Sequence, residues 1–158
     1  FITPKGSYDV DGIGYAPQGA ILKDGEKIDV KNHEDASKLI QVAALLANAE
    51  LFEIEGTDQW KVSGEPTEAA MLVLARKAGY LREELERIHS RTAEIPFHYH
   101  RKYHAILTSN GKDEQIAIAG APEVLFDLGE VVKVVQPRFS SHSIASPSRV
   151  RSSSTVFR

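Results

Sequence analysis

Residues 94–107 read EIPFHYHRKYHAIL, a segment that runs from an aromatic, cation-rich stretch into an apolar alternation. Pro96 has no N–H to donate to a sheet ladder, so the chain up to this residue is expected at a sheet edge or a strand start. From Tyr103 onward, apolar residues occupy both faces of a two-residue alternation, which predicts a well-buried strand. A ring at Phe97 followed by a cation at Lys102 suits a ligand that is flat and aromatic at one end and anionic at the other, such as a nucleotide.

The segment that follows predicts a hairpin. Asn110-Gly111 is a turn signal, and residues 115–119 form the expected return strand. The sequence GAPE at residues 120–123 ends that strand and begins a short helix through Leu128, and residues 131–135 are a further strand candidate.

Three helices and more β-structure are expected upstream. Asn32 predicts a helix N-cap, and apolar residues then recur at helical spacing to about Glu50. Residues 51–55 and 59–62 predict two short strands. A second helix begins within residues 63–68, with Pro66 in its first turn, and stops at Gly79. A third, charged helix carries Leu81, Leu85 and Ile88.

Residues 1–22 predict strands and turns. Gly12, Gly14 and Gly19 suggest a dinucleotide-binding loop, but the third glycine of G-x-G-x-x-G falls at Pro17 and no helix is expected after it. We therefore interpret these glycines as turn residues.

Composition indicates one globular domain. The 158 residues are 42% apolar and 26% charged, and the formal net charge of -3 does not favour nucleic-acid binding. The absence of cysteine excludes disulfide and thiolate chemistry, and no apolar run reaches the roughly 20 residues that span a bilayer.

The C-terminal end differs in composition. Residues 137–158 are rich in serine, contain four arginines and no acidic residue, and contribute +4 to the net -3, so residues 1–136 carry -7. Such a segment is either a basic arm for nucleic acid or acidic lipid, or a disordered end with too little apolar surface to fold. We expect a nucleotide-binding domain over 1–136 and a disordered or foreign tail over 137–158.

Several separated motifs together resemble the nucleotide-binding domain of P-type cation-transporting ATPases, most closely those of the calcium type or of related bacterial and archaeal pumps. GEPTEAA at residues 64–70 is similar to its G-[DE]-P-T-E-x-A motif, the most specific of the matches. Residues 97–102 are similar to F-x-x-x-R-K, and residues 120–123 to the end of K-G-A-P-E. Weaker similarities at residues 8–19 and 47–49 extend the resemblance over about residues 1–128.

The resemblance implies roles for the matched residues. Phe97 would stack on adenine, Glu68 would lie beside the adenine amino group, Lys102 would approach the phosphate or ribose side, and Gly120 would let the backbone approach the base. The residues so implicated are Glu65, Thr67, Glu68, Phe97, Lys102 and Gly120. From residue chemistry alone, helix-start electrostatics explains Glu65 and Glu68 better than a ligand contact does.

The resemblance also implies what lies outside this chain. The D-K-T-G-T phosphorylation motif, the hinge and the membrane helices are absent, so we expect an excised cytoplasmic domain of a membrane-embedded pump. It would hold ATP for phosphoryl transfer to an aspartate of another domain and catalyse nothing by itself. The parent would be a Mg-dependent, ATP-driven cation translocase, and the partners would be its phosphorylation and actuator domains, with no nucleic acid and no membrane contact.

Two alternatives remain open. His98, His100 and His104 would suit a histidine-based metal-binding module, although no carboxylate or thiol pattern accompanies them. Ala119 replaces the lysine of K-G-A-P-E, which would suit a pseudo-domain of the same fold that no longer binds nucleotide. The expected fold is α+β, an antiparallel, twisted sheet with helices packed on it.

Overall fold

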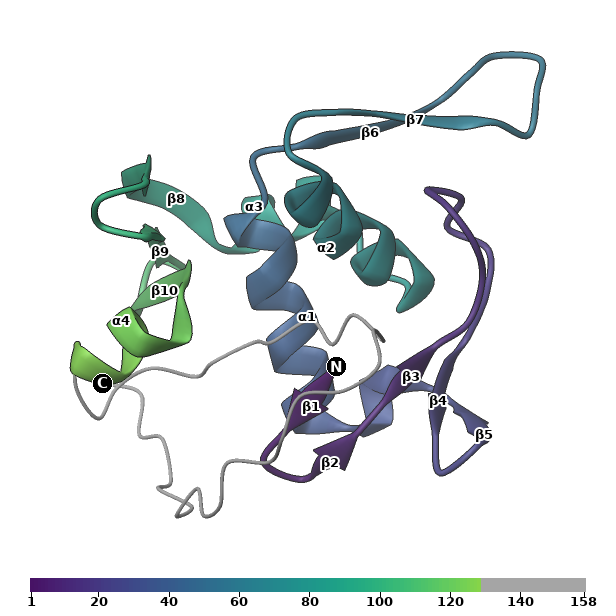
Figure 1. Cartoon of the computed structure of the whole chain (residues 1–158), viewed down its shortest axis with the longest axis horizontal. Coiled ribbons are helices and arrows are strands. Elements are labelled where there is room, and N and C mark those ends of the chain that lie inside the picture. Colours follow the sequence, from purple (N-terminus) through teal and green to yellow (C-terminus); the bar gives the residue numbers. More distant parts are fainter. Residues whose placement is uncertain (129–158) are drawn as a thin grey trace.

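Helices α1 and α2 pack against each other at the centre of the structure, and small antiparallel sheets surround them (Figure 1). The computed structural model describes residues 1–128. Its helices are α1 (Glu34–Leu46), α2 (Pro66–Lys77), α3 (Arg82–Ile88), α4 (Pro122–Asp127) and the 3-10 turn η1 (Val30–Asn32). Its strands are β1 (Ile2–Thr3), β2 (Gly6–Ser7), β3 (Asp9–Val10), β4 (Ile21–Lys23), β5 (Glu26–Ile28), β6 (Glu50–Glu53), β7 (Trp60–Ser63), β8 (Ser90–His98), β9 (Tyr103–Ser109) and β10 (Glu114–Gly120).

The α+β class is confirmed, and the described strands form four sheets. They are the pair β1-β2, the three-stranded sheet β3-β4-β5, the hairpin β6-β7 and the three-stranded sheet β10-β9-β8, all antiparallel. Residues 11–20 connect β3 to β4 without a helix, as the turn interpretation of the glycines predicted. None of the helices within residues 1–128 is both long and apolar enough to cross a membrane.

Small side chains let the two central helices approach closely. Ala36, Ala43 and Ala44 of α1 are buried, as are Ala69 and Ala75 of α2. Alanine has no side-chain rotamer freedom to lose in a helix and favours the helical backbone, so this stripe supports both the helix and its packing. The predicted amphipathic stripe is thus confirmed, with its alanines in the core.

The predicted boundaries of α1 were wrong at both ends. Asn32 ends the 3-10 turn and caps no α-helix, because Asp29 Oδ1 accepts from the Lys31 N–H (3.0 Å) and starts a separate turn there. The helix begins at Glu34 after His33 and ends at Leu46, four residues before the expected Glu50.

The start and stop of α2 are confirmed. Pro66 occupies its first turn, where its missing N–H costs no helical hydrogen bond, and Gly79 follows the helix with φ 76°. Gly64 lies against Ala49 with φ 109°, and a Cβ there would stand 2.9 Å from Ala49 Cα. A side chain at position 64 would therefore push the loop before α2 away from β6.

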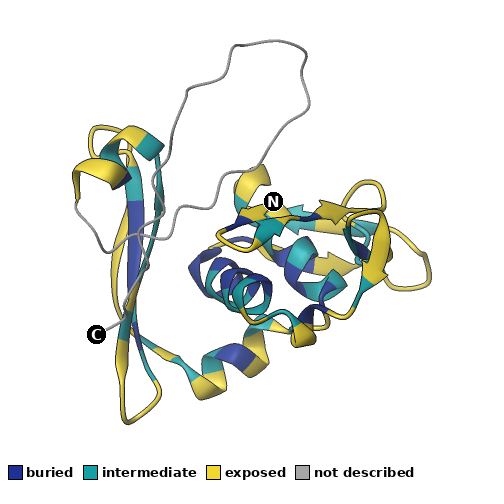
Figure 2. Ribbon diagram, turned by 90° about the horizontal axis from the view of Figure 1, so that it is seen from below, coloured by how far each residue is buried: buried dark blue, intermediate teal, exposed yellow. Residues whose placement is uncertain are grey.

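The sheet β10-β9-β8 carries the quoted sequence. Asn110 Oδ1 accepts from the Lys112 and Asp113 N–H groups (2.9 and 2.8 Å), which closes the predicted turn between β9 and β10. Strand β8 lies at the sheet edge, as Pro96 predicted. Strand β9 is the central, buried strand, and it forms the dark blue band of the upright sheet in Figure 2.

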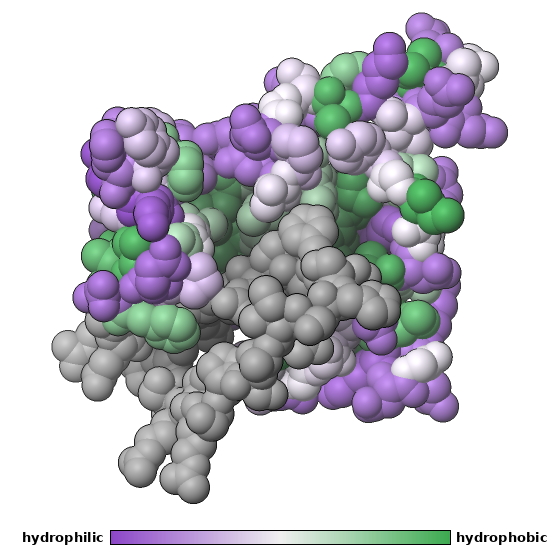
Figure 3. All heavy atoms as spheres, viewed as in Figure 1, coloured by the Kyte–Doolittle hydropathy of each residue, from purple (hydrophilic) through white to green (hydrophobic). Residues whose placement is uncertain are grey.

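The core runs from α1 into this sheet. Ile40 and Ala44 of α1 share one hydrophobic cluster with Ile106 of β9, and Ala117 and Ala119 of β10 pack against it. A cavity of about 280 Å³ remains between α1 and the sheet, lined mainly by apolar side chains such as Leu39, Leu46 and Ile118. Figure 3 shows apolar atoms in the hollow between the sheet and the helices. The strand candidate 131–135 and the tail 137–158 lie outside the described residues.

Candidate functional site

His104 lies at the centre of the candidate site. It is only 4% exposed on β9, and its two ring nitrogens face carboxylates from two other elements. Nδ1 is 3.9 Å from Glu68 Oε1 on α2, and Nε2 is 3.1 Å from Glu94 Oε1 on β8. The Nε2 contact lacks hydrogen-bond geometry, and no other hydrogen-bond partner of this buried nitrogen is found among residues 1–128. One imidazole thus separates two carboxylates, each of which would otherwise repel the other.

Glu94 is fixed by Asn48, which follows α1, and by Arg91 of its own strand β8. Asn48 Nδ2 donates to Glu94 Oε1 (2.7 Å), and Arg91 Nη1 donates to Glu94 Oε2 (3.0 Å) and Asn48 Oδ1 (2.7 Å). The Asn48 hydrogen bond holds the pKa of the Glu94 carboxyl below its usual value, with Arg91 adding to the same effect against the opposing cost of burial. Glu94 is therefore an ionised anchor of defined orientation.

Asn48 also orients Glu68. Its backbone N–H donates to Glu68 Oε2 (3.2 Å), while Oε1 faces His104. Glu68 lies in the first turn of α2, where a carboxylate interacts favourably with the helix dipole. The helix-start interpretation therefore holds for Glu68, but this carboxylate has specific partners in addition.

A β-bulge presents Phe97 beside His104. Ile95 pairs with Ala105 and His98 with Tyr103, so both Pro96 and Phe97 stand opposite the single residue His104. Bulges re-aim side chains and occur frequently next to active sites. The Phe97 ring is 60% exposed. On the other side of β9, Ala119 is the direct register partner of His104, so these positions share one row across the sheet.

Lys102 and Gly120 meet at the turn between β8 and β9. Lys102 adopts a positive φ of 56°, and its carbonyl accepts from the Ala121 N–H (2.9 Å). A Cβ on Gly120 would collide with the Lys102 carbonyl oxygen and lie 2.7 Å from Tyr103 Cβ. The close approach of two backbone segments therefore explains why a glycine is needed at position 120, without reference to any ligand.

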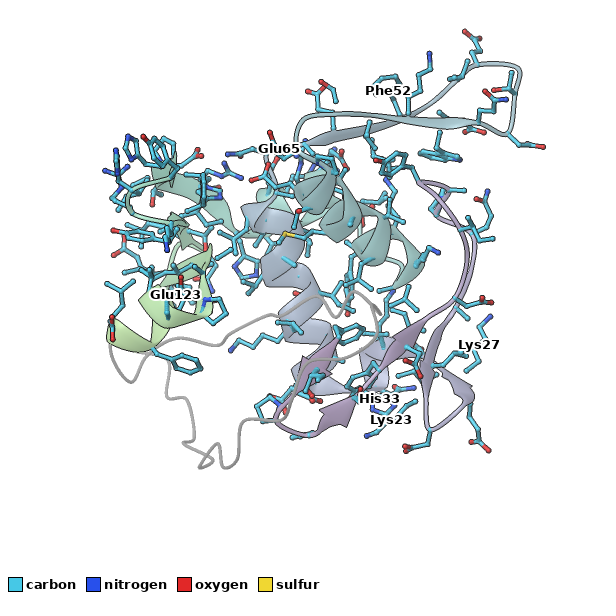
Figure 4. The ribbon with its side chains drawn as sticks, in the orientation of Figure 1. Lys23, Lys27, His33, Phe52, Glu65 and Glu123 are labelled. Carbon is cyan, nitrogen blue, oxygen red and sulfur yellow. The ribbon has the colours of Figure 1, made fainter. Side chains whose placement is uncertain are left out.

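The Lys102 ammonium is exposed and pairs with Glu123 of α4, with 3.1 Å between Nζ and Oε1. The pKa of the Glu123 carboxyl lies below its usual value because its own backbone N–H and then Lys102 stabilise the charged form. Glu65 and Thr67 are exposed at the start of α2, and within the described residues neither side chain makes a hydrogen bond or ion pair. Figure 4 shows Glu65 and Glu123 on separate elements.

The three histidines of the metal hypothesis do not converge. The His98 and His100 rings stack on each other with centroids 5.3 Å apart, whereas His104 is buried between the two carboxylates. Across residues 1–128, no group of three or more His, Cys, Asp or Glu side chains is arranged to hold a metal ion.

Sequence reasoning missed the network around His104. Glu68, Glu94 and His104 come from α2, β8 and β9, and no local spacing links them. The alternation of β9 placed His104 on its buried face, which was the only signal that this histidine needs polar partners.

Comparison with known proteins fixes the family. A family model described as "P-type ATPase, cytoplasmic domain N" matches residues 35–136. The chain belongs to this family. This N domain is 37% identical over 127 residues to the "Probable cation-transporting ATPase F" of Mycobacterium tuberculosis, an alignment that covers 80% of the chain and 14% of that relative.

Two further relatives carry related names. The "Calcium-transporting ATPase" of Bacillus subtilis is 31% identical over 120 residues, covering 75% of the chain and 13% of the relative. The "Cation-transporting ATPase pma1" of a Synechocystis strain is 31% identical over 139 residues, covering 80% of the chain and 15% of the relative. The chain thus spans about one seventh of these relatives, and it corresponds to a single domain of each.

Proposed function

We propose that this N domain binds ATP by contacting the adenine ring of the nucleotide. The observation that carries the proposal is the exposed Phe97 ring at the β8 bulge, opposite the buried His104, whose Nδ1 lies 3.9 Å from the partly exposed Glu68 carboxylate. Phe97 would stack on the base, an interaction worth about 1–3 kcal/mol. The Glu68 carboxylate would accept from the adenine amino group, with Glu65 and Thr67 on the same helix turn beside it.

Lys102 would serve the phosphate or ribose side of the nucleotide. Its ion pair with Glu123 is exposed to solvent, and such pairs contribute little, so an anionic ligand can replace Glu123 at low cost. Gly120 keeps the β9–β10 backbones close at this point and leaves room for the base. Since Ala119 supplies no cation, we expect ATP binding that is weak but genuine. If the chain does not bind ATP, the pseudo-domain alternative is favoured.

The role in the parent protein follows from the family. We propose that the domain holds ATP so that an aspartate of another domain, outside this chain, receives the phosphoryl group. Mg would act in the parent enzyme, and the phosphorylation and actuator domains would be the partners of this cytoplasmic domain of a membrane-embedded pump. The relatives are named for cation or calcium transport, and we propose a calcium-type pump. No nucleic-acid or membrane contact is proposed for the domain, and the chain alone should hydrolyse no ATP.

Calorimetric titration of the 158-residue chain with ATP tests the proposal. Phe97→Ala should weaken ATP binding by about 1–3 kcal/mol because base stacking is lost. Tyr99→Ala is the matched control, since Tyr99 is another exposed ring of the same hairpin, 70% exposed, and stacks on His98 and His100 instead.

Three outcomes would contradict parts of this assignment. Unchanged affinity of a folded Phe97→Ala variant would exclude the adenine platform. Binding that disappears on addition of a chelator would favour a metal-dependent site. No binding at millimolar ATP would favour the pseudo-domain.

A further inference from the structure

His104 has a chemical environment that plain burial in a core does not explain. It is 4% exposed, and nevertheless its Nε2 has no well-formed hydrogen bond within the described part of the chain. A buried polar atom without a partner is costly, and such atoms in folded proteins call for a specific explanation. An apolar side chain at position 104 would avoid this cost and would continue the buried face formed by Ile106.

The neighbours of His104 point to that explanation. Glu94 Oε1 lies 3.1 Å from Nε2 and is itself fixed by Asn48 and Arg91. Glu68 Oε1 lies 3.9 Å from Nδ1, a separation that is too long for a hydrogen bond but closes with a small movement of either side chain. In the absence of ligand, hydrogen bonds of functional groups are often long and tighten only in the complex.

We infer that His104 is a positioning residue that sets the orientation of the Glu68 carboxylate and thereby the preference of this N domain for adenine over other purines. The inference rests on the proposed function. Asn48 holds Oε2 of Glu68 through its backbone N–H, so Oε1 is the oxygen left to face the base. His104 Nδ1 lies 3.9 Å from that same oxygen on the sheet side, and the hydrogen bond that forms when this gap closes would limit the rotation of the carboxylate.

This arrangement selects for an amino group on the ligand. A carboxylate only accepts hydrogen bonds, so it suits the 6-amino donor of adenine and opposes the 6-carbonyl acceptor of hypoxanthine. A carboxylate that is free to turn would lose this contrast, because its oxygens could move away from the carbonyl. A positioned carboxylate keeps both the attraction and the repulsion, which is the basis of specificity.

The affinities for ATP and ITP of the 158-residue chain test the inference, since the two nucleotides differ only in the group at position 6 and in the proton that ITP carries on the adjacent N1. The wild-type chain should prefer ATP by about three- to tenfold, the range for one net hydrogen bond. His104→Leu should reduce the ATP/ITP ratio to about 1, because ATP binding weakens as the attraction is lost and ITP binding improves as the repulsion is relieved. His104→Gln, which keeps a donor at this position, should retain most of the preference.

Two further variants complete the design. Glu68→Gln should abolish or reverse the ATP preference, since the Asn48 N–H would hold the amide oxygen and leave the amide NH2, a donor, to face the base. Thr108→Val is the matched control for strand packing, because Thr108 lies on the same face of β9 and is also 4% exposed. It should leave the ATP/ITP ratio unchanged, and thermal unfolding should show that every variant is folded.

The results that would overturn the inference are distinguishable. If the wild-type chain binds neither nucleotide at millimolar concentration, the proposed function and the inference fail together. Equal binding of ATP and ITP by the wild type would leave nucleotide binding intact but remove the role of Glu68. If His104→Leu keeps the wild-type ratio, or Thr108→Val loses it, only the positioning role of His104 is refuted.

Discussion

Arg91 joins the end of α1 to the edge strand β8, and its removal should loosen the attachment of the whole sheet. Its guanidinium donates to the Leu45 carbonyl (2.5 Å), the Asn48 side chain (2.7 Å) and Glu94 (3.0 Å). The Leu45 carbonyl belongs to the last turn of α1, where no further helical N–H is available to it. Arg91→Met keeps the apolar stem and removes these three hydrogen bonds.

The expected loss follows from those contacts. Leaving the Leu45 carbonyl without its partner should cost about 1–3 kcal/mol. Removal of a cation from a helix C-terminus should cost about 0.3–1 kcal/mol. The ion pair with Glu94 is about a quarter exposed on each side and should contribute at most about 1 kcal/mol. These terms overlap, so we expect a total near 2–4 kcal/mol, a large fraction of the roughly 5–15 kcal/mol that stabilises a folded domain.

Urea denaturation followed by circular dichroism measures this loss. With a slope typical of a small domain, the midpoint should fall by about 1–2 M. Arg87→Met is the matched control, because Arg87 is exposed on α3 and makes no hydrogen bond or ion pair within the described structure. Since Arg87 lies in the last turn of α3, its removal should change the free energy of unfolding by at most about 0.3–1 kcal/mol. Equal midpoints for the two variants would refute the idea that Arg91 fastens the sheet to the helices.

Three further outcomes are expected. Gly120→Ala should destabilise the fold by about 1–3 kcal/mol in urea denaturation, because the added Cβ would overlap the Lys102 carbonyl. An unchanged urea midpoint would contradict the close approach of Gly120 to Lys102. Because the pKa of Glu94 is lower in the folded chain, its contribution to stability is present above its usual value of 4.5 and is lost as the pH falls through the lowered pKa. Glu94→Gln should therefore show a shallower loss of thermal stability between about pH 5 and 3, and parallel curves would exclude this role. Ala119→Lys should tighten ATP binding up to about fivefold, more at low salt; no change at either of two salt concentrations would show that position 119 does not face the nucleotide.

The sequence predicted those elements whose signals are local. Pro66 and Gly79 define the two ends of α2, and Asn110-Gly111 defines the turn between β9 and β10, because each conformation depends on one or two residues. The end of α1 was predicted wrongly because partners distant in sequence determine it. Arg82 donates to the carbonyls of Ala47 and Ala49, which are 35 and 33 residues away in the sequence. A local pattern of apolar residues cannot predict contacts over such a distance.

The candidate site, too, could be predicted from the sequence only in part, because contacts between distant residues build it. Motif resemblance identified Glu68 and Phe97 separately, whereas the structure places His104 between them, 3.9 Å from the Glu68 carboxylate and opposite Phe97 across the sheet. A histidine on the buried face of a strand signals that polar partners exist, but it does not say which ones. Those partners depend on how α1, α2 and the sheet pack, and here that packing places two carboxylates on either side of one imidazole. The proposed adenine site would depend on the attachment of β8 to α1, so Arg91→Met should weaken the preference for ATP over ITP as well as the fold.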